Sequence, residues 1–164
     1  MRYRGNVEKY RAFYSEHKDK LFAYLMRMTG DYYLSSDIMQ EAFTRHLERY
    51  PHEVARAPLL YAIARNALFD HLRRQRKNVD LEGDLTDCCD DQEHALMVRQ
   101  EYRRVLLALR RLDGEQRDLL ALAISGDLSY HEIASVTGIS EANVKVRIHR
   151  ARLKLREILD GGDV

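Results

Sequence analysis

The sequence predicts an all-α fold in which two small helical domains are joined by an acidic linker. The helix formers Leu, Ala, Arg and Glu are abundant, and the 164 residues include only two prolines. No stretch alternates between apolar and polar residues as a half-buried strand does. Apolar residues make up 45% of the chain and charged residues 32%, which is typical of a soluble, folded protein.

The first domain is predicted over residues 1–77 as a bundle of three helices. Apolar and aromatic side chains recur every three or four residues along each helix, which gives each one a face to bury. Gly30 ends the first helix, Pro51 stops the second, and Pro58 suits the first turn of the third. The first apolar stripe covers residues 10–28, residues 29–31 end the first helix and start the second, the second stripe covers 39–50, and the third helix is expected over 58–77.

Residues 78–93 lack helical periodicity and are rich in Asp and Glu, which predicts the linker. This stretch is interpreted both as a solvated segment and as a tether whose charge keeps it off DNA. The second domain is predicted over residues 94–164. Its first two helices are expected at 94–112 and 116–125, and Gly126 closes the second of them.

A helix-turn-helix is predicted after these two helices. Ser129 and Glu132 have the spacing of a capping box, which starts a short helix. Gly138 then permits a tight turn, and Ser140 can cap a second helix. Four apolar residues of that second helix recur at helical spacing: Val144, Ile148, Ala151 and Leu155.

The opposite face of this last helix is basic, as the major groove of DNA requires. The alternative is a solvated helix that merely carries cations. The net charge of +1 is small, yet the positive residues are gathered in two places. One is the last helix. The other is the end of the third helix, with Arg65, Arg73, Arg74, Arg76 and Lys77. Two basic patches suggest two contacts with nucleic acid.

Other classes of site are poorly supported. No apolar run approaches the ~20 residues of a membrane span and no signal peptide is evident, so we expect no membrane insertion and a cytoplasmic location. Cys88 and Cys89 are adjacent, which disfavours a structural disulfide and leaves a redox-sensitive thiol pair as the alternative. With only His94 nearby, they also fall short of a zinc site. We expect no metal, no cofactor and no catalytic residues.

Several segments, in their order and spacing, resemble the extracytoplasmic-function (ECF) group of bacterial RNA polymerase sigma factors. They are DIMQEAF at 37–43, YAIARN at 61–66, DHLRR at 70–74, LSYHEIA at 128–134 and GIS at 138–140, with Asn143, Val144, Lys145, His149, Arg150 and Ala151 beyond. The resemblance covers nearly the whole chain. It implies that the first domain binds the clamp of the RNA polymerase core and opens the −10 promoter element. It also implies that the second domain reads the −35 element and touches the polymerase flap, and that an anti-sigma factor regulates the protein.

The resemblance assigns polymerase docking to Asp37, Gln40 and Glu41 on the second helix. Two carboxylates and an amide suit a basic coiled coil on the clamp. Asp37 alone also fits another interpretation, that of an acidic residue complementing the dipole at a helix start.

The resemblance places the −10 contacts on the third helix. Asn66 is the candidate for a base edge, and the arginines are candidates for phosphates. Phe69 is expected either to stack on a base or to pack on the first helix, and Arg65 has a salt bridge to a neighbouring helix as its alternative. Where the family often has Trp, this chain has Leu59, so Tyr61 is expected to contribute in its place. The full set is Tyr61, Arg65, Asn66, Phe69, Asp70, Arg73, Arg74 and Arg76.

The −35 contacts are expected at the start of the last helix and along its basic face. Arg147 and Arg150 are the candidates for bases, Lys145 and Lys154 for phosphates, and Val146 for a thymine methyl group. The full set is Ser140, Glu141, Asn143, Lys145, Val146, Arg147, Arg150 and Lys154. Two alternatives remain: a free-standing helix-turn-helix regulator, and a sigma-like protein that does not initiate transcription.

Overall fold

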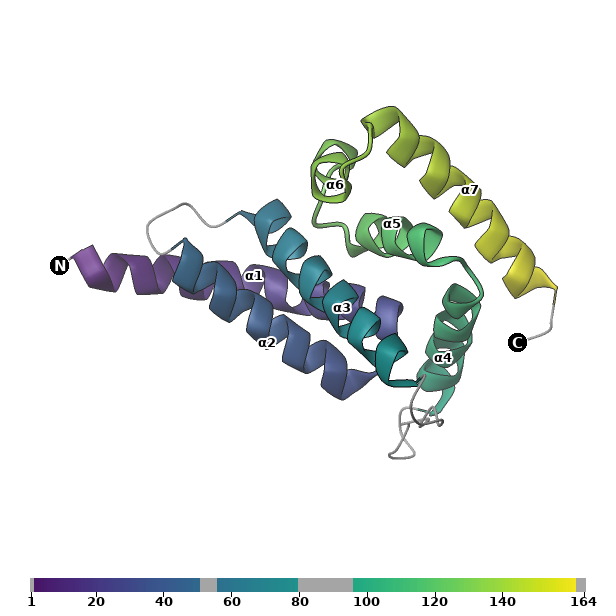
Figure 1. Cartoon of the computed structure of the whole chain (residues 1–164), viewed down its shortest axis with the longest axis horizontal. Coiled ribbons are helices and arrows are strands. Elements are labelled where there is room, and N and C mark those ends of the chain that lie inside the picture. The colour runs from purple at the N-terminus through teal and green to yellow at the C-terminus, as the bar shows by residue number, and fades with distance from the viewer. Residues whose placement is uncertain (1, 51–55, 80–95, 162–164) are drawn as a thin grey trace.

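Seven helices make up the residues that the computed structural model describes, 2–50, 56–79 and 96–161, and these ranges contain no strand (Figure 1). The helices are α1 (Arg2–Thr29), α2 (Tyr32–Arg49), α3 (Ala57–Val79), α4 (Leu96–Arg110), α5 (Gly114–Ser125), α6 (Tyr130–Thr137) and α7 (Glu141–Asp160). We call α1–α3 the first group and α4–α7 the second group. The all-α prediction is confirmed.

The first group is the predicted three-helix bundle, and α2 starts where the break at residues 29–31 predicts. The Asp31 side chain accepts a hydrogen bond from the Leu34 backbone amide at 3.0 Å, so this residue caps the helix. Gly30, with φ of 71°, makes the sharp turn out of α1. The helix therefore begins at Tyr32, directly after the break predicted at residues 29–31.

The third helix continues to Val79, slightly beyond the predicted boundary at residue 77. Residues 80–93 of the predicted linker lie outside the described residues, and so do Cys88, Cys89 and His94. The division of the chain into 1–77, 78–93 and 94–164 therefore remains a prediction.

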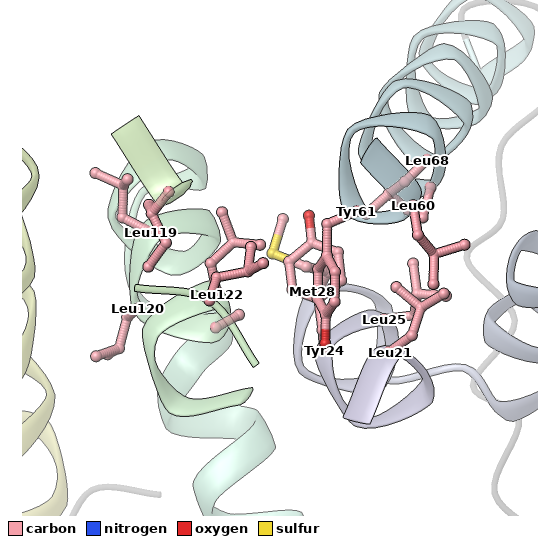
Figure 2. Packing of buried hydrophobic residues seen from close by; sticks show 14 of the residues in the cluster. Leu21, Tyr24, Leu25, Met28, Leu60, Tyr61, Leu68, Leu119, Leu120 and Leu122 are labelled. Carbon is pink, nitrogen blue, oxygen red and sulfur yellow. The ribbon is translucent and has the colours of Figure 1, made fainter. Parts of the chain in front are cut away.

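The two groups share one hydrophobic core. Helix α5 packs along α1, and α6 packs against α3. Figure 2 shows Tyr24, Met28 and Tyr61 between the leucines of α5 on one side and Leu21, Leu25 and Leu60 on the other. In this structure the two groups are thus closed against each other, with apolar side chains of both inside a single cluster.

Helix α5 is buried on every side near its middle. Residues 118–122 are five consecutive buried positions, more than one full turn, so neighbours must cover the helix all round. On one side lies α1 and on another lies α7. The apolar sequence of α5 is therefore explained by packing against both groups at once.

Arg117 joins α5 to the ends of two other helices. Its guanidinium donates hydrogen bonds to the backbone carbonyls of Leu109 (2.9 Å), Arg110 (2.7 Å) and Leu112 (3.1 Å). A longer contact of 3.5 Å reaches the carbonyl of Met28 near the end of α1. The last carbonyls of a helix lack partners within it, so Arg117 closes α4. Burial lowers the pKa of this guanidinium.

Replacement of Leu25 by Ala tests the shared core. Leu25 is fully buried, and truncation of such a side chain costs about 2–5 kcal/mol of unfolding free energy. We expect a lower urea midpoint, followed by far-ultraviolet circular dichroism. Tyr33→Ala, at a residue that is 74% exposed, is the control and should change stability by about 0.5 kcal/mol or less. Equal midpoints for the two variants would contradict this assignment of the core.

Candidate nucleic-acid interface

The helix-turn-helix forms as the sequence predicted. The Ser129 and Glu132 side chains each bond to the other's backbone amide, at 3.2 and 2.8 Å, which completes the capping box of α6. Gly138 ends α6 with φ of 75°. The Ser140 hydroxyl then accepts a hydrogen bond from the Asn143 amide at 3.3 Å and caps α7. Local side chains therefore determine where both helices begin and end.

Helix α7 has one buried face and one basic face. Val144, Ile148 and Ala151 are buried against the other helices of the second group. The predicted −35 residues are on the opposite side: Ser140, Asn143, Lys145, Val146, Arg150 and Lys154 are exposed, while Glu141 and Arg147 are partly covered. This arrangement presents cations and amide groups toward solvent, as contact with a DNA groove requires.

Some of these cationic side chains form ion pairs with carboxylates of the same chain. Lys145 lies 2.8 Å from Glu141, and this hydrogen bond and charge lower the pKa of Glu141 and raise that of Lys145. Arg147 lies 2.6 Å from Glu115 at the start of α5. Arg150 is exposed on the same basic face as Lys154. One guanidinium nitrogen of Arg147, Nη1, is therefore already paired in this structure.

The predicted −10 residues of α3 divide into exposed and covered ones. Asn66, Arg73, Arg74 and Arg76 are exposed, and Arg73 is paired at 2.8 Å with Asp70, one turn earlier. Together they give the end of α3 a polar, mostly basic surface next to the second group.

Arg65 adopts the alternative that its sequence allowed, a salt bridge to a neighbouring helix. Its Nε donates to a carboxylate oxygen of Asp118 in α5 at 2.7 Å. Its guanidinium also lies over the ring of Phe69, 4.7 Å from the ring centroid. Phe69 in turn is partly buried and packs on the core. In this structure both side chains serve packing between helices.

Tyr61 is covered in this structure. It was expected to contribute to −10 contacts, but its side chain is fully buried and lies against Tyr24, with 5.6 Å between the ring centroids. This burial raises the pKa of the Tyr61 hydroxyl. The reason is the closed arrangement of the two groups, in which the side chains around Tyr61 come from α1 and α5 as well as α3 (Figure 2). DNA has no access to Tyr61 in this arrangement.

Asp37, Gln40 and Glu41 are exposed together on α2, opposite the buried Ile38 and Ala42. Glu41 pairs with Arg45 at 2.6 Å. The alternative interpretation of Asp37, as a charge at the helix start, does not fit. The first turn of α2 contains no acidic residue, because the helix begins at Tyr32.

A cleft of about 1160 Å³ separates the predicted −10 surface from the predicted −35 surface. Arg65, Asn66 and Arg73 line it from α3, and Arg147 lines it from α7. The acidic residues Glu115 and Asp118 of α5 lie in the same lining. Sequence reasoning did not single out these two carboxylates, since their cationic partners are distant along the chain.

Two kinds of site are not found in the described residues. No group of three His, Cys, Asp or Glu side chains in these ranges is arranged to hold a metal ion. Among the described helices, none is both long enough and apolar enough to span a membrane.

Comparison with known proteins identifies the family. Residues 13–78 match the model "Sigma-70 region 2", and residues 102–155 match "Sigma-70, region 4". The ECF RNA polymerase sigma factor SigM of Bacillus subtilis is 31% identical, over 91% of this chain and 94% of that protein. The ECF RNA polymerase sigma factor SigL of Mycobacterium tuberculosis is 32% identical, over 90% and 89%. The chain belongs to the ECF sigma factors.

This sigma factor directs promoter-specific initiation of transcription, and its partners are RNA polymerase and promoter DNA. The resemblance and the function predicted from the sequence are confirmed. Sigma factors are non-enzymatic initiation factors. The fold is similar to that of the sigma factor RpoE from Bartonella quintana, solved in complex with the anti-sigma factor NepR. The TM-score is 0.74 at 19% identity, covering 94% of this chain and 98% of that one.

Gly138→Ala tests the turn of the helix-turn-helix. A left-handed backbone costs an L-residue with a Cβ about 1–2 kcal/mol, and Gly138 has φ of 75°. We expect a lower melting temperature for Gly138→Ala. Ser135→Ala, at an exposed position inside α6, is the control, and it should leave the melting temperature unchanged or slightly higher because Ala favours helix. A melting temperature of Gly138→Ala equal to that of the wild type would contradict the role of this turn.

Proposed function

We propose that the first group docks on the polymerase and opens the −10 element, while the second group reads the −35 element. The observation that carries this proposal is α7, a capped helix whose exposed face bears Lys145, Arg150 and Lys154. Such a helix fits the major groove, with its first turns at base edges and its later residues at phosphates. In this role the sigma factor supplies promoter choice, without catalysis of its own.

Docking on the polymerase clamp is assigned to Asp37, Gln40 and Glu41. The support is their common exposure on one face of α2, without a role at the helix start. The charge of this face is complementary to a basic partner.

Opening of the −10 element is assigned to the polar surface of α3. Asn66 supplies an amide for a base edge, and Arg73, Arg74 and Arg76 supply charge for phosphates. Arg65, Phe69 and Tyr61 join this surface only after the two groups separate, because each is now partly or wholly covered.

We extend the proposal to an anti-sigma partner and to the cytoplasm. The similar sigma factor RpoE was solved in complex with an anti-sigma factor, which supports a partner of the same kind here. The partners RNA polymerase and promoter DNA support a cytoplasmic location.

Transcription in vitro tests the proposal. Sigma-free core polymerase, the purified chain and a library of promoter sequences should together yield transcripts that share two elements. A free-standing regulator would instead bind its operator without core enzyme. A sigma-like protein without initiation activity would associate with the core and give no transcript.

Gln40→Ala combined with Glu41→Ala tests docking. Both side chains are exposed, so we expect an intact fold and loss of co-purification with core polymerase. The matched control is Thr44→Ala with Glu48→Ala, two exposed positions further along α2, and it should retain core binding. Undiminished core binding by the Gln40 and Glu41 variant would remove this assignment.

Arg150→Ala and Lys154→Ala test the −35 surface as a pair. A bidentate base contact contributes about 1–3 kcal/mol of discrimination, whereas a phosphate contact contributes to all sequences alike. We therefore expect Arg150→Ala to relax the sequence profile in a binding assay, and Lys154→Ala to weaken binding evenly. Arg147 is a poorer probe, because its substitution also removes the ion pair with Glu115. Identical profiles for the two variants would argue against the division.

A further inference from the structure

Two tyrosines are exposed at the start of α2, beside the turn that joins this helix to α1. Tyr32 is 62% exposed and Tyr33 is 74% exposed, more than any other large apolar side chain of the described residues. The Tyr32 ring contacts the ring of Phe22 in α1, with 5.3 Å between the centroids, and the Tyr33 ring contacts that of Tyr32 at 5.7 Å. We call these three side chains the aromatic cluster. None of the three belongs to the buried core, so the packing of the fold does not account for them.

The aromatic cluster is held in place by local structure. Gly30 makes the sharp turn out of α1, and the side chain of Asp31 caps the first turn of α2. The ring planes of Phe22 and Tyr32 meet at 69° and those of Tyr32 and Tyr33 at 84°, the edge-to-face contact that aromatic rings prefer. A ring held in this way loses little conformational freedom when a partner covers it. Tyr33 is therefore well organised for binding before any partner arrives.

Tyr33 lies on the same face of α2 as the proposed docking residues. It precedes Asp37 by four residues, Gln40 by seven and Glu41 by eight, which are the spacings of one helix face. All four side chains are exposed in the closed arrangement. Tyr32 is about 100° further round the helix, on the side where α1 packs. Tyr33 thus extends the proposed docking face by one turn toward α1.

A basic partner suits the tyrosine as well as the carboxylates. The face of an exposed aromatic ring attracts ammonium and guanidinium groups, and the stems of Lys and Arg pack on it. Exposed charges contribute mainly to the rate of association, whereas most of the binding energy of an interface comes from a few residues, among which Tyr is enriched. One of the two carboxylates of the docking face, Glu41, is already paired with Arg45 at 2.6 Å. The polar residues alone therefore lack an anchor, and the aromatic cluster offers one.

We propose that Tyr33 is the anchor of polymerase docking, with its ring packed against cationic side chains of the clamp. Asp37, Gln40 and Glu41 then form the polar part of the same contact. Tyr32 acts as a positioning residue, because its ring holds that of Tyr33 at the edge of the interface. This inference depends on the docking function proposed above for α2. It adds the turn between α1 and α2 to the surface that the polymerase covers.

Tyr33→Ala in the full chain tests the anchor. We expect binding to sigma-free core polymerase, measured by surface plasmon resonance without promoter DNA, to weaken about tenfold or more, mainly through faster dissociation. Tyr33→Phe keeps the ring and should bind within about twofold of the wild type. The matched control is Leu47→Ala, which removes an apolar side chain that is 45% exposed further along α2, and it should bind like the wild type. An unchanged urea midpoint for Tyr33→Ala separates lost binding from lost folding.

Salt separates the anchor from the charged residues. Raising the salt concentration from about 50 to about 200 mM should slow association of the wild type and of Tyr33→Ala alike, because screening acts on the carboxylates. The ratio of their dissociation rates should stay constant, since the ring contact is short-ranged and desolvated. A ratio that falls to one at the higher salt concentration would overturn the assignment of Tyr33 as the anchor.

The remaining outcomes distinguish this inference from the proposed function. Wild-type affinity of Tyr33→Ala, with binding lost in the Gln40 and Glu41 variant, overturns the anchor and leaves the docking face intact. Retained binding in both variants overturns the proposed docking function itself. Normal core binding by Tyr33→Ala without transcripts would assign the ring to DNA, and a wild-type dimer that Tyr33→Ala converts to monomers would assign it to a second copy of the chain. Either result overturns the inference.

Discussion

The burial of α5 is the constraint on which the rest of this structure depends. Five consecutive residues of α5 are buried, because neighbours cover the helix on every side in this structure. The second group alone supplies α6 and α7, and α1 of the first group supplies the remaining cover. The buried Asp118 then requires partners of its own, which it finds in Tyr24 and Arg65. The contacts that hold the two groups closed are thus centred on one helix, α5.

This closure connects packing to the exposure of the proposed −10 surface. The contacts that bury the apolar face of α5 also cover Tyr61 and occupy Arg65, both on the proposed −10 surface. The proposed docking face of α2 lies outside this junction and stays exposed. In the closed chain the proposed docking face is thus fully accessible, while part of the proposed −10 surface is covered.

Local signals in the sequence were sufficient to predict the helix-turn-helix. Ser129, Glu132, Gly138 and Ser140 act on backbone groups within a few residues of themselves, so their spacing alone determines the caps and the turn. The exposed polar faces of α2 and α7 follow from helical periodicity in the same way. The start of α2 follows from the break at residues 29–31, although the tyrosines of its first turn are exposed and lie outside the apolar stripe.

Contacts between the groups could not be predicted in this way. Asp118 meets Arg65 across 53 residues of chain and Tyr24 across 94, and no periodic pattern records such a pairing. One signal was available: Asp118 directly precedes the apolar run of α5, where a lone carboxylate must find a partner. The burial of Tyr61 could not be predicted for the same reason, since it depends on the other group.

The pairing of Asp118 with Arg65 also limits how this protein can evolve. Loss of either partner alone would leave the other charge buried without a counterion, which is costly in proteins, whereas replacement of both by well-packed apolar residues is tolerated. Positions 65 and 118 should therefore drift together through lineages rather than one at a time. A descendant with apolar side chains at both positions would keep the closed fold but would lose an arginine from the proposed −10 surface. The ion pair therefore couples the packing of the two groups to promoter recognition.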